Sequence, residues 1–118
     1  MPSQEEHRQH PRHHPPKGVS LTLRRDPPEP GEESLHLLCR DISRTGLGVA
    51  FPHAISPDTD VELWIALPDD GQHLHLYGTV AWCAAPLGQW RAGIALNLER
   101  SDGHYWSAHF DDHDVAGY

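Results

Sequence analysis

The stretch that decides the fold is Cys39–Phe51, which reads Cys-Arg-Asp-Ile-Ser-Arg-Thr-Gly-Leu-Gly-Val-Ala-Phe. At its centre lies Asp41-x-Ser43-x-x-Gly46, and strand-like apolar residues lie on both sides of it. Asp and Ser side chains supply short hydrogen-bonding groups, and glycine allows a sharp backbone turn. The pattern predicts a corner between two strands. The simplest interpretation is a β-turn in which Asp41 and Ser43 bond only their own backbone.

Short alternating segments surround this corner, with an apolar residue at every second position. This is the pattern of a strand with one buried face. The predicted strands are residues 19–25, 35–42, 46–51, 61–67, 74–83 and 90–98. The predicted turns are residues 26–33, 52–60, 68–71 and 85–89. Strands of this length and spacing predict an all-β fold, a six-stranded antiparallel β-barrel closed around one core.

The first part of the chain differs in composition from the predicted barrel. Residues 1–18 are rich in Pro, His and charge and have almost no apolar side chains, so we expect a flexible N-terminal segment that does not fold alone. Arg8 and Arg12 lie on this segment, and in the simplest interpretation they are two solvated charges. The folded domain is predicted to cover residues 19–110.

The last part of the chain favours a short C-terminal helix over residues 101–110. Ser101 is able to cap this helix, and Trp106 and Phe110 lie one turn apart on the same face. Residues 111–118 are polar, and we expect them to form a frayed tail.

Length and composition restrict the protein class. The chain has 118 residues and a formal net charge of −8, which suits one domain and argues against a nucleic-acid duplex as a partner. It contains no apolar run long enough to cross a bilayer and no apolar signal-peptide core, so we expect no membrane insertion. Cys39 and Cys83 lie in apolar strand segments, which favours buried free thiols and a cytoplasmic protein over a disulfide.

Two motifs together point to a family. The pair Arg8-x-x-x-Arg12 precedes the Asp-x-Ser-x-x-Gly motif, with one strand and the start of the next between them. Together they resemble the PilZ domain, a bacterial receptor module for cyclic di-GMP. The strand ending Gly93–Leu96, followed by a short helix, is similar as well. The resemblance covers roughly residues 8–110.

The resemblance implies that cyclic di-GMP is bound by Arg8, Arg12, Asp41, Ser43 and Gly46. A guanidinium can clamp a phosphate with two donors or stack flat on a guanine. The N1–H and N2–H₂ donors of guanine suit the carboxylate of Asp41, and Ser43 can donate or accept. Gly46 lets the backbone come close to a ligand.

Two further residues are weaker candidates for this site. Arg44 is the nearest additional cation, with a solvated turn residue as the alternative. Trp82 lies where the family sometimes offers an aromatic ring to the ligand, and a core tryptophan is the alternative because its alternation matches the apolar face of the same strand. The sequence departs from the family at His7, where many members carry a second arginine before the motif.

Metal and enzyme chemistry find little support in the sequence. The histidines near the N-terminus, His7, His10, His13 and His14, are close together, but the segment lacks Cys and rigid spacing, so no metal site is expected. The chain has no glycine-rich phosphate loop, nucleophile elbow or His-Glu-x-x-His motif, so no enzyme activity and no cofactor are expected.

These observations predict a cyclic di-GMP receptor of the bacterial cytoplasm. The ligand would order the segment from about Glu5 to Pro16 across the barrel. Since the sequence shows no second domain for an output, the signal would pass to an unidentified effector protein. The alternative is an adaptor with the same fold that binds protein and no nucleotide.

Overall fold

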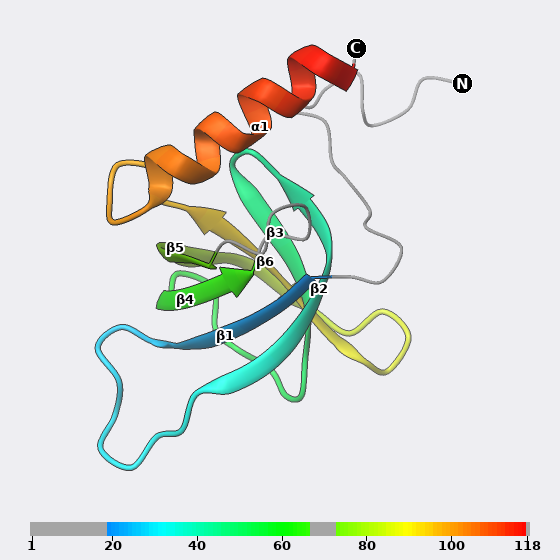
Figure 1. Ribbon diagram of the computed structural model, residues 1–118. Helices are drawn as coiled ribbons and strands as arrows, with labels where there is room; N and C mark the ends of the chain where they lie inside the picture. Colours follow the sequence, from blue (N-terminus) through cyan, green and yellow to red (C-terminus); the bar gives the residue numbers. More distant parts are fainter. Residues whose placement is uncertain (1–18, 67–72, 118) are drawn as a thin grey trace.

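The computed structural model describes residues 19–66 and 73–117, without the side chains of Arg40 and residues 111–117. Its elements are β1 (Val19–Arg25), β2 (Leu35–Ser43), β3 (Gly46–Phe51), β4 (Asp60–Ala66), β5 (His73–Ala84), β6 (Trp90–Leu96) and α1 (Gly103–Gly117). The strands pair antiparallel and close into a barrel in the order β1-β2-β3-β6-β5-β4, as Figure 1 shows. The predicted six-stranded barrel with a C-terminal helix is confirmed.

The core fills the barrel because alternate residues of each strand point inward. α1 lies across one end of the barrel (Figure 1), where Trp106 and Phe110 are buried with their ring centroids 4.8 Å apart. The core consists of Val19, Leu21, Leu23, Cys39, Ile42, Leu47, Val49, Phe51, Ile55, Val61, Leu63, Ile65, Leu74, Leu76, Val80, Ala92, Ile94, Trp106 and Phe110.

Two β-bulges interrupt the alternation. The pairing shifts between Cys39 and Asp41 on β2 and between Val80 and Trp82 on β5. A bulge adds one residue to one strand, so the two residues that flank the extra one face opposite sides of the sheet. Cys39 and Val80 therefore point into the core, while Asp41 and Trp82 point outward. The expectation that Trp82 shares the apolar face of its strand is wrong, since its side chain is on the outside and 44% exposed.

The start of α1 differs from the predicted cap. The helix begins at Gly103, and the carbonyl of Asp102 accepts the first helical bonds, from Tyr105 N at 3.0 Å and Trp106 N at 3.1 Å. Ser101 has a φ of 49° and its Oγ lies 2.6 Å from Nδ1 of His75. Ser101 thus precedes the cap position, and its hydroxyl contacts the barrel.

The helix also extends beyond its predicted end at Phe110. Residues 111–116 contain no proline or glycine, and the next glycine after Phe110 is Gly117, where the helix ends. The predicted turn at 68–71 lies outside the described residues. Cys39 and Cys83 are free thiols, as expected, but only Cys39 is buried and Cys83 is half-buried. Among residues 19–66 and 73–117, no helix has the length and hydropathy that a membrane crossing requires.

Candidate functional site

Four residues form one row across the outer face of the barrel. Asp41 on β2 pairs with Gly48 on β3, Gly48 pairs with Gly93 on β6, and Gly93 pairs with Trp82 on β5. Asp41 and Trp82 face outward because of the two bulges described above, and they meet Gly48 and Gly93 on that face. The row therefore places a carboxylate and an indole on either side of two adjacent glycines.

The two glycines are required by the side chains that lie over them. A Cβ at Gly48 would lie 3.2 Å from Oδ2 and from Cβ of Asp41, and a Cβ at Gly93 would overlap the indole of Trp82. Asp41 and Trp82 thus lean over a floor made of backbone alone. Because the indole lies on this floor and is 44% exposed, its outer side is open for a flat ring to stack on it.

The corner between β2 and β3 lies at one end of this face. Ser43 is buried, and its Oγ donates to the carbonyl of Gly46 at 3.3 Å, which is the local bond that the simplest interpretation of the motif predicts. A Cβ at Gly46 would lie 2.8 Å from the carbonyl oxygen of Ile94, so this glycine permits close pairing with β6. In this structure Ser43 and Gly46 shape the corner.

Helix α1 holds the corner in place. The indole Nε1 of Trp106 donates to the carbonyl of Ser43 at 3.2 Å and to the carbonyl of Arg44 at 2.9 Å. The guanidinium Nε of Arg44 in turn donates to Oγ of Ser107 at 2.9 Å. Arg44 is therefore a helix contact in this structure and not a purely solvated turn residue.

A family model for the PilZ domain matches residues 6–106. The match covers most of the chain and includes both the arginine pair and the Asp-x-Ser-x-x-Gly corner. The chain belongs to the PilZ domain family. The family predicted from the two motifs is therefore confirmed.

The PilZ domain shares its fold with solved structures of low sequence identity. One is the inhibitor of motility MotI/DgrA of Bacillus subtilis, with a TM-score of 0.71, 15% identity and coverage of 98% of this chain and 57% of that one. Another is YcgR of Escherichia coli in complex with c-di-GMP, with a TM-score of 0.69, 11% identity and coverage of 93% and 47%.

A third is the PilZ domain of CeSA from a cellulose-synthesizing bacterium, with a TM-score of 0.58, 17% identity and coverage of 81% of this chain and 91% of that one. The chain spans about half the length of MotI/DgrA and YcgR. No curated protein matches the sequence.

The predicted site residues of this PilZ domain fall into three groups. Asp41 and Trp82 share the glycine row. Ser43, Arg44 and Gly46 form the adjacent corner. The arginine pair lies outside the described residues. Within the described part of the chain, no group of three His, Cys, Asp or Glu residues is arranged to hold a metal ion.

Sequence reasoning missed the two floor glycines. A glycine inside a strand loses more backbone entropy than other residues and often marks a close approach of another group. Gly48 and Gly93 each sit inside a strand, so their positions carried a signal. What the sequence did not supply was the pairing that sets them side by side.

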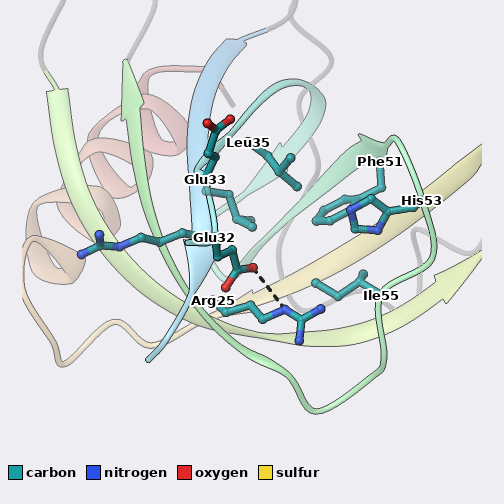
Figure 2. A pocket seen from close by; sticks show the side chains of 9 residues that line it. Arg25, Glu32, Glu33, Leu35, Phe51, His53 and Ile55 are labelled. Carbon is teal, nitrogen blue, oxygen red and sulfur yellow. Dashed lines mark ion pairs between the residues drawn. The ribbon is translucent and has the colours of Figure 1, made fainter. Parts of the chain in front are cut away.

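A pocket lies beside the loop that joins β1 to β2, which Figure 1 shows at the end of the barrel away from α1, and Figure 2 shows this pocket from close by. It is a cavity of about 140 Å³ whose apolar lining includes Leu35, Phe51 and Ile55. Figure 2 shows the guanidinium of Arg25 beside the carboxylate of Glu32, with Nε and Oε2 3.3 Å apart. None of the described site candidates lines this cavity.

A network of polar side chains covers the outer face of β1, β4 and β5. The carboxylate of Glu62 accepts from Nε of Arg24 at 2.8 Å and from Tyr77 OH at 3.3 Å, and its Oε2 lies 2.6 Å from Nε2 of His75. Burial raises the pKa of Glu62, but the hydrogen bonds and charges of His75 and Arg24 lower it by more, so the pKa lies below 4.5.

Proposed function

We propose that this PilZ domain is a receptor for cyclic di-GMP in the bacterial cytoplasm and acts as a signalling protein without enzymatic activity. The observation that carries the proposal is the row of Asp41, Gly48, Gly93 and Trp82 on the outer face of a barrel whose family match includes both motifs. Complexes of YcgR with c-di-GMP are among the structures that share the fold, which supports the same ligand class here.

The geometry of the row suits a guanine base. A flat ring stacked on the exposed indole of Trp82 lies above the glycine floor, where the two glycines place no side chain of their own. The edge of that ring then faces the carboxylate of Asp41, which accepts from the N1–H and N2–H₂ donors of guanine. An adenine presents a different edge, so this arrangement selects guanine.

The arginine pair completes the site from the N-terminal segment. Arg8 and Arg12 bind the phosphates and stack on the second guanine, because forked guanidinium donors match phosphate oxygens. Ordering the segment from about Glu5 to Pro16 opposes binding by roughly 1–2 kcal/mol for each residue fixed, and the ligand contacts must exceed this cost. The ordered segment gives the barrel a new surface, which an effector protein recognises.

Titration calorimetry with cyclic di-GMP tests the ligand. Arg8→Ala and Arg12→Ala should each weaken binding by about 2–5 kcal/mol, because each removes a charge-assisted contact. Arg25→Ala serves as the matched control, since Arg25 lies at the far end of the barrel beside the cavity of Figure 2. No heat of binding with the unmodified chain would reject the nucleotide and favour the protein-binding adaptor.

Backbone NMR relaxation tests the signal separately. Amides from Arg8 to His14 should be mobile in the free protein and rigid in the complex. A segment that is rigid without ligand, or that stays mobile at saturation, would reject the ordering mechanism even when the nucleotide binds.

A further inference from the structure

The arginines of the barrel differ in how their side chains are engaged. Four of them have partners: Arg24 pairs with Glu62, Arg25 with Glu29 and Glu32, Arg44 with Ser107, and Arg100 with Asp26. Arg91 is exposed and makes no ion pair or side-chain hydrogen bond with any residue that the structure describes. Its guanidinium is therefore available to a ligand.

Arg91 lies next to the glycine row. It is two residues from Gly93 on β6, so both face outward, about 7 Å apart along the strand. Its partners on the neighbouring strands are Ala50 on β3 and Ala84 on β5, and both alanines are exposed. These methyl groups are too short to cover the guanidinium, which is free to turn toward the floor.

Among the side chains that the structure describes, none places a positive charge on the floor itself. Its charged group is the carboxylate of Asp41, and the guanidinium of Arg44 is directed to Ser107 on α1. A guanine nucleotide carries its phosphate a few ångströms from the base, so a base above the glycines brings that phosphate close to the next row of the sheet. Without a cation in that row, the acidic chain, with a net charge of −8, would disfavour the phosphate.

We propose that Arg91 binds a phosphate of the nucleotide whose base lies between Asp41 and Trp82. This inference rests on the proposed function and adds a cation fixed on the barrel to the two on the N-terminal segment. Because Arg91 belongs to a strand, its contact does not require that segment to become ordered. The barrel face therefore recognises both parts of a guanine nucleotide, the base and the phosphate.

The test compares Arg91→Ala and Arg91→Lys with Arg25→Ala, which removes the same charge from β1, on the opposite side of the closed barrel from β6. In cyclic di-GMP titrations, Arg91→Ala should weaken binding about tenfold, and Arg91→Lys by less because it keeps the charge and loses the fork. Arg25→Ala should stay within about twofold of the unmodified chain, as expected for a distant, screened charge. Added salt should weaken binding less steeply in Arg91→Ala than in the control.

The same substitution in an Arg8→Ala/Arg12→Ala background separates a direct contact from an indirect one. An equal fold-loss there supports a contact made by the barrel alone, whereas no further loss would show that Arg91 acts through the segment and would overturn the inference. Unchanged affinity of Arg91→Ala, with weakened binding by Asp41→Ala, would also overturn it while leaving the receptor function intact. Failure of the unmodified chain to bind cyclic di-GMP would reject both the receptor function and the Arg91 contact.

Discussion

The two sides of the barrel are built differently. On the outer face of β1, β4 and β5, Glu62 accepts from Arg24 and Tyr77 and bonds His75, and the guanidinium of Arg24 lies 5.2 Å from the ring centroid of Trp64. The face across β2, β3, β6 and β5 instead has two glycines and two alanines between its larger side chains. The polar side chains of the first face, which we call the closed side, bond one another. The second face, which we call the open side, leaves an indole and a guanidinium exposed.

This difference separates stability from recognition. Side chains that bond one another across strands hold the barrel closed and have little left for a ligand. A floor of glycines contributes little packing and costs backbone entropy, so its arrangement is not explained by stability. The comparison predicts that substitutions on one side change folding and that substitutions on the other change binding.

The largest expected effect is on the open side. Asp41→Ala should weaken cyclic di-GMP binding by about 2–5 kcal/mol, because the guanine donors lose a charged acceptor. The melting temperature should hardly change. Calorimetry and thermal unfolding check this, with Glu33→Ala as a control that removes an exposed acid at the other end of the barrel. A large fall in melting temperature with full affinity would mean that Asp41 serves only the corner.

The converse effect is expected on the closed side. Glu62→Ala should lower the free energy of unfolding by about 1–3 kcal/mol, since Arg24 and His75 lose their buried partner. Cyclic di-GMP affinity should remain the same. Denaturant unfolding and the same titration measure both quantities. If Glu62→Ala weakened cyclic di-GMP binding as much as Asp41→Ala does, the assignment of stability to one face and binding to the other would be wrong.

An effect of similar size, on binding, tests the floor itself. Gly93→Ala places a methyl group in the position of the Trp82 ring, so the indole must move off the floor. Ligand affinity should fall by about 1–3 kcal/mol, the usual contribution of a base stacked on an aromatic side chain. In a Trp82→Ala background the same substitution should have no further effect on binding. Additive losses would show that Gly93 matters for a reason other than the ring.

The smallest effect is the pH dependence of the closed side. The pKa of Glu62 is lower in the folded protein than the usual 4.5, so this carboxylate stabilises the fold fully above that pH. The contribution is lost as the pH falls through the lower, folded value. Unfolding curves recorded from neutral pH downward should show this loss in the unmodified chain and a reduced one in Glu62→Gln. If the two proteins lost stability identically as the pH fell, the acid sensitivity would come from groups other than Glu62.

Local pattern was enough to predict the strands. Residues 19–25 and 46–51 were predicted with the bounds that the structure has, because each alternates regularly between turn-forming segments. The prediction that Trp82 faces inward with the apolar residues of its strand was wrong because a bulge is not visible in an alternating pattern. The extra residue, Ala81, is small and breaks no rule of composition.

Long-range pairing accounts for the rest of what the sequence did not reveal. Asp41 and Trp82 are far apart in the chain, and their placement in one row depends on three successive strand pairings. The partners of Glu62 likewise come from β1 and β5. Such contacts depend on register, which a single sequence states only indirectly.

The bulge at Ala81 has a consequence for aligning related sequences. A chain that lacked this residue would pair regularly, and its tryptophan would still lie opposite Gly93, because the face of a residue follows its partner across the sheet. A one-residue gap at this point is therefore compatible with the same site. An alignment anchored on Val80 by counting positions would misplace the ring, whereas one anchored on Gly93 would find it.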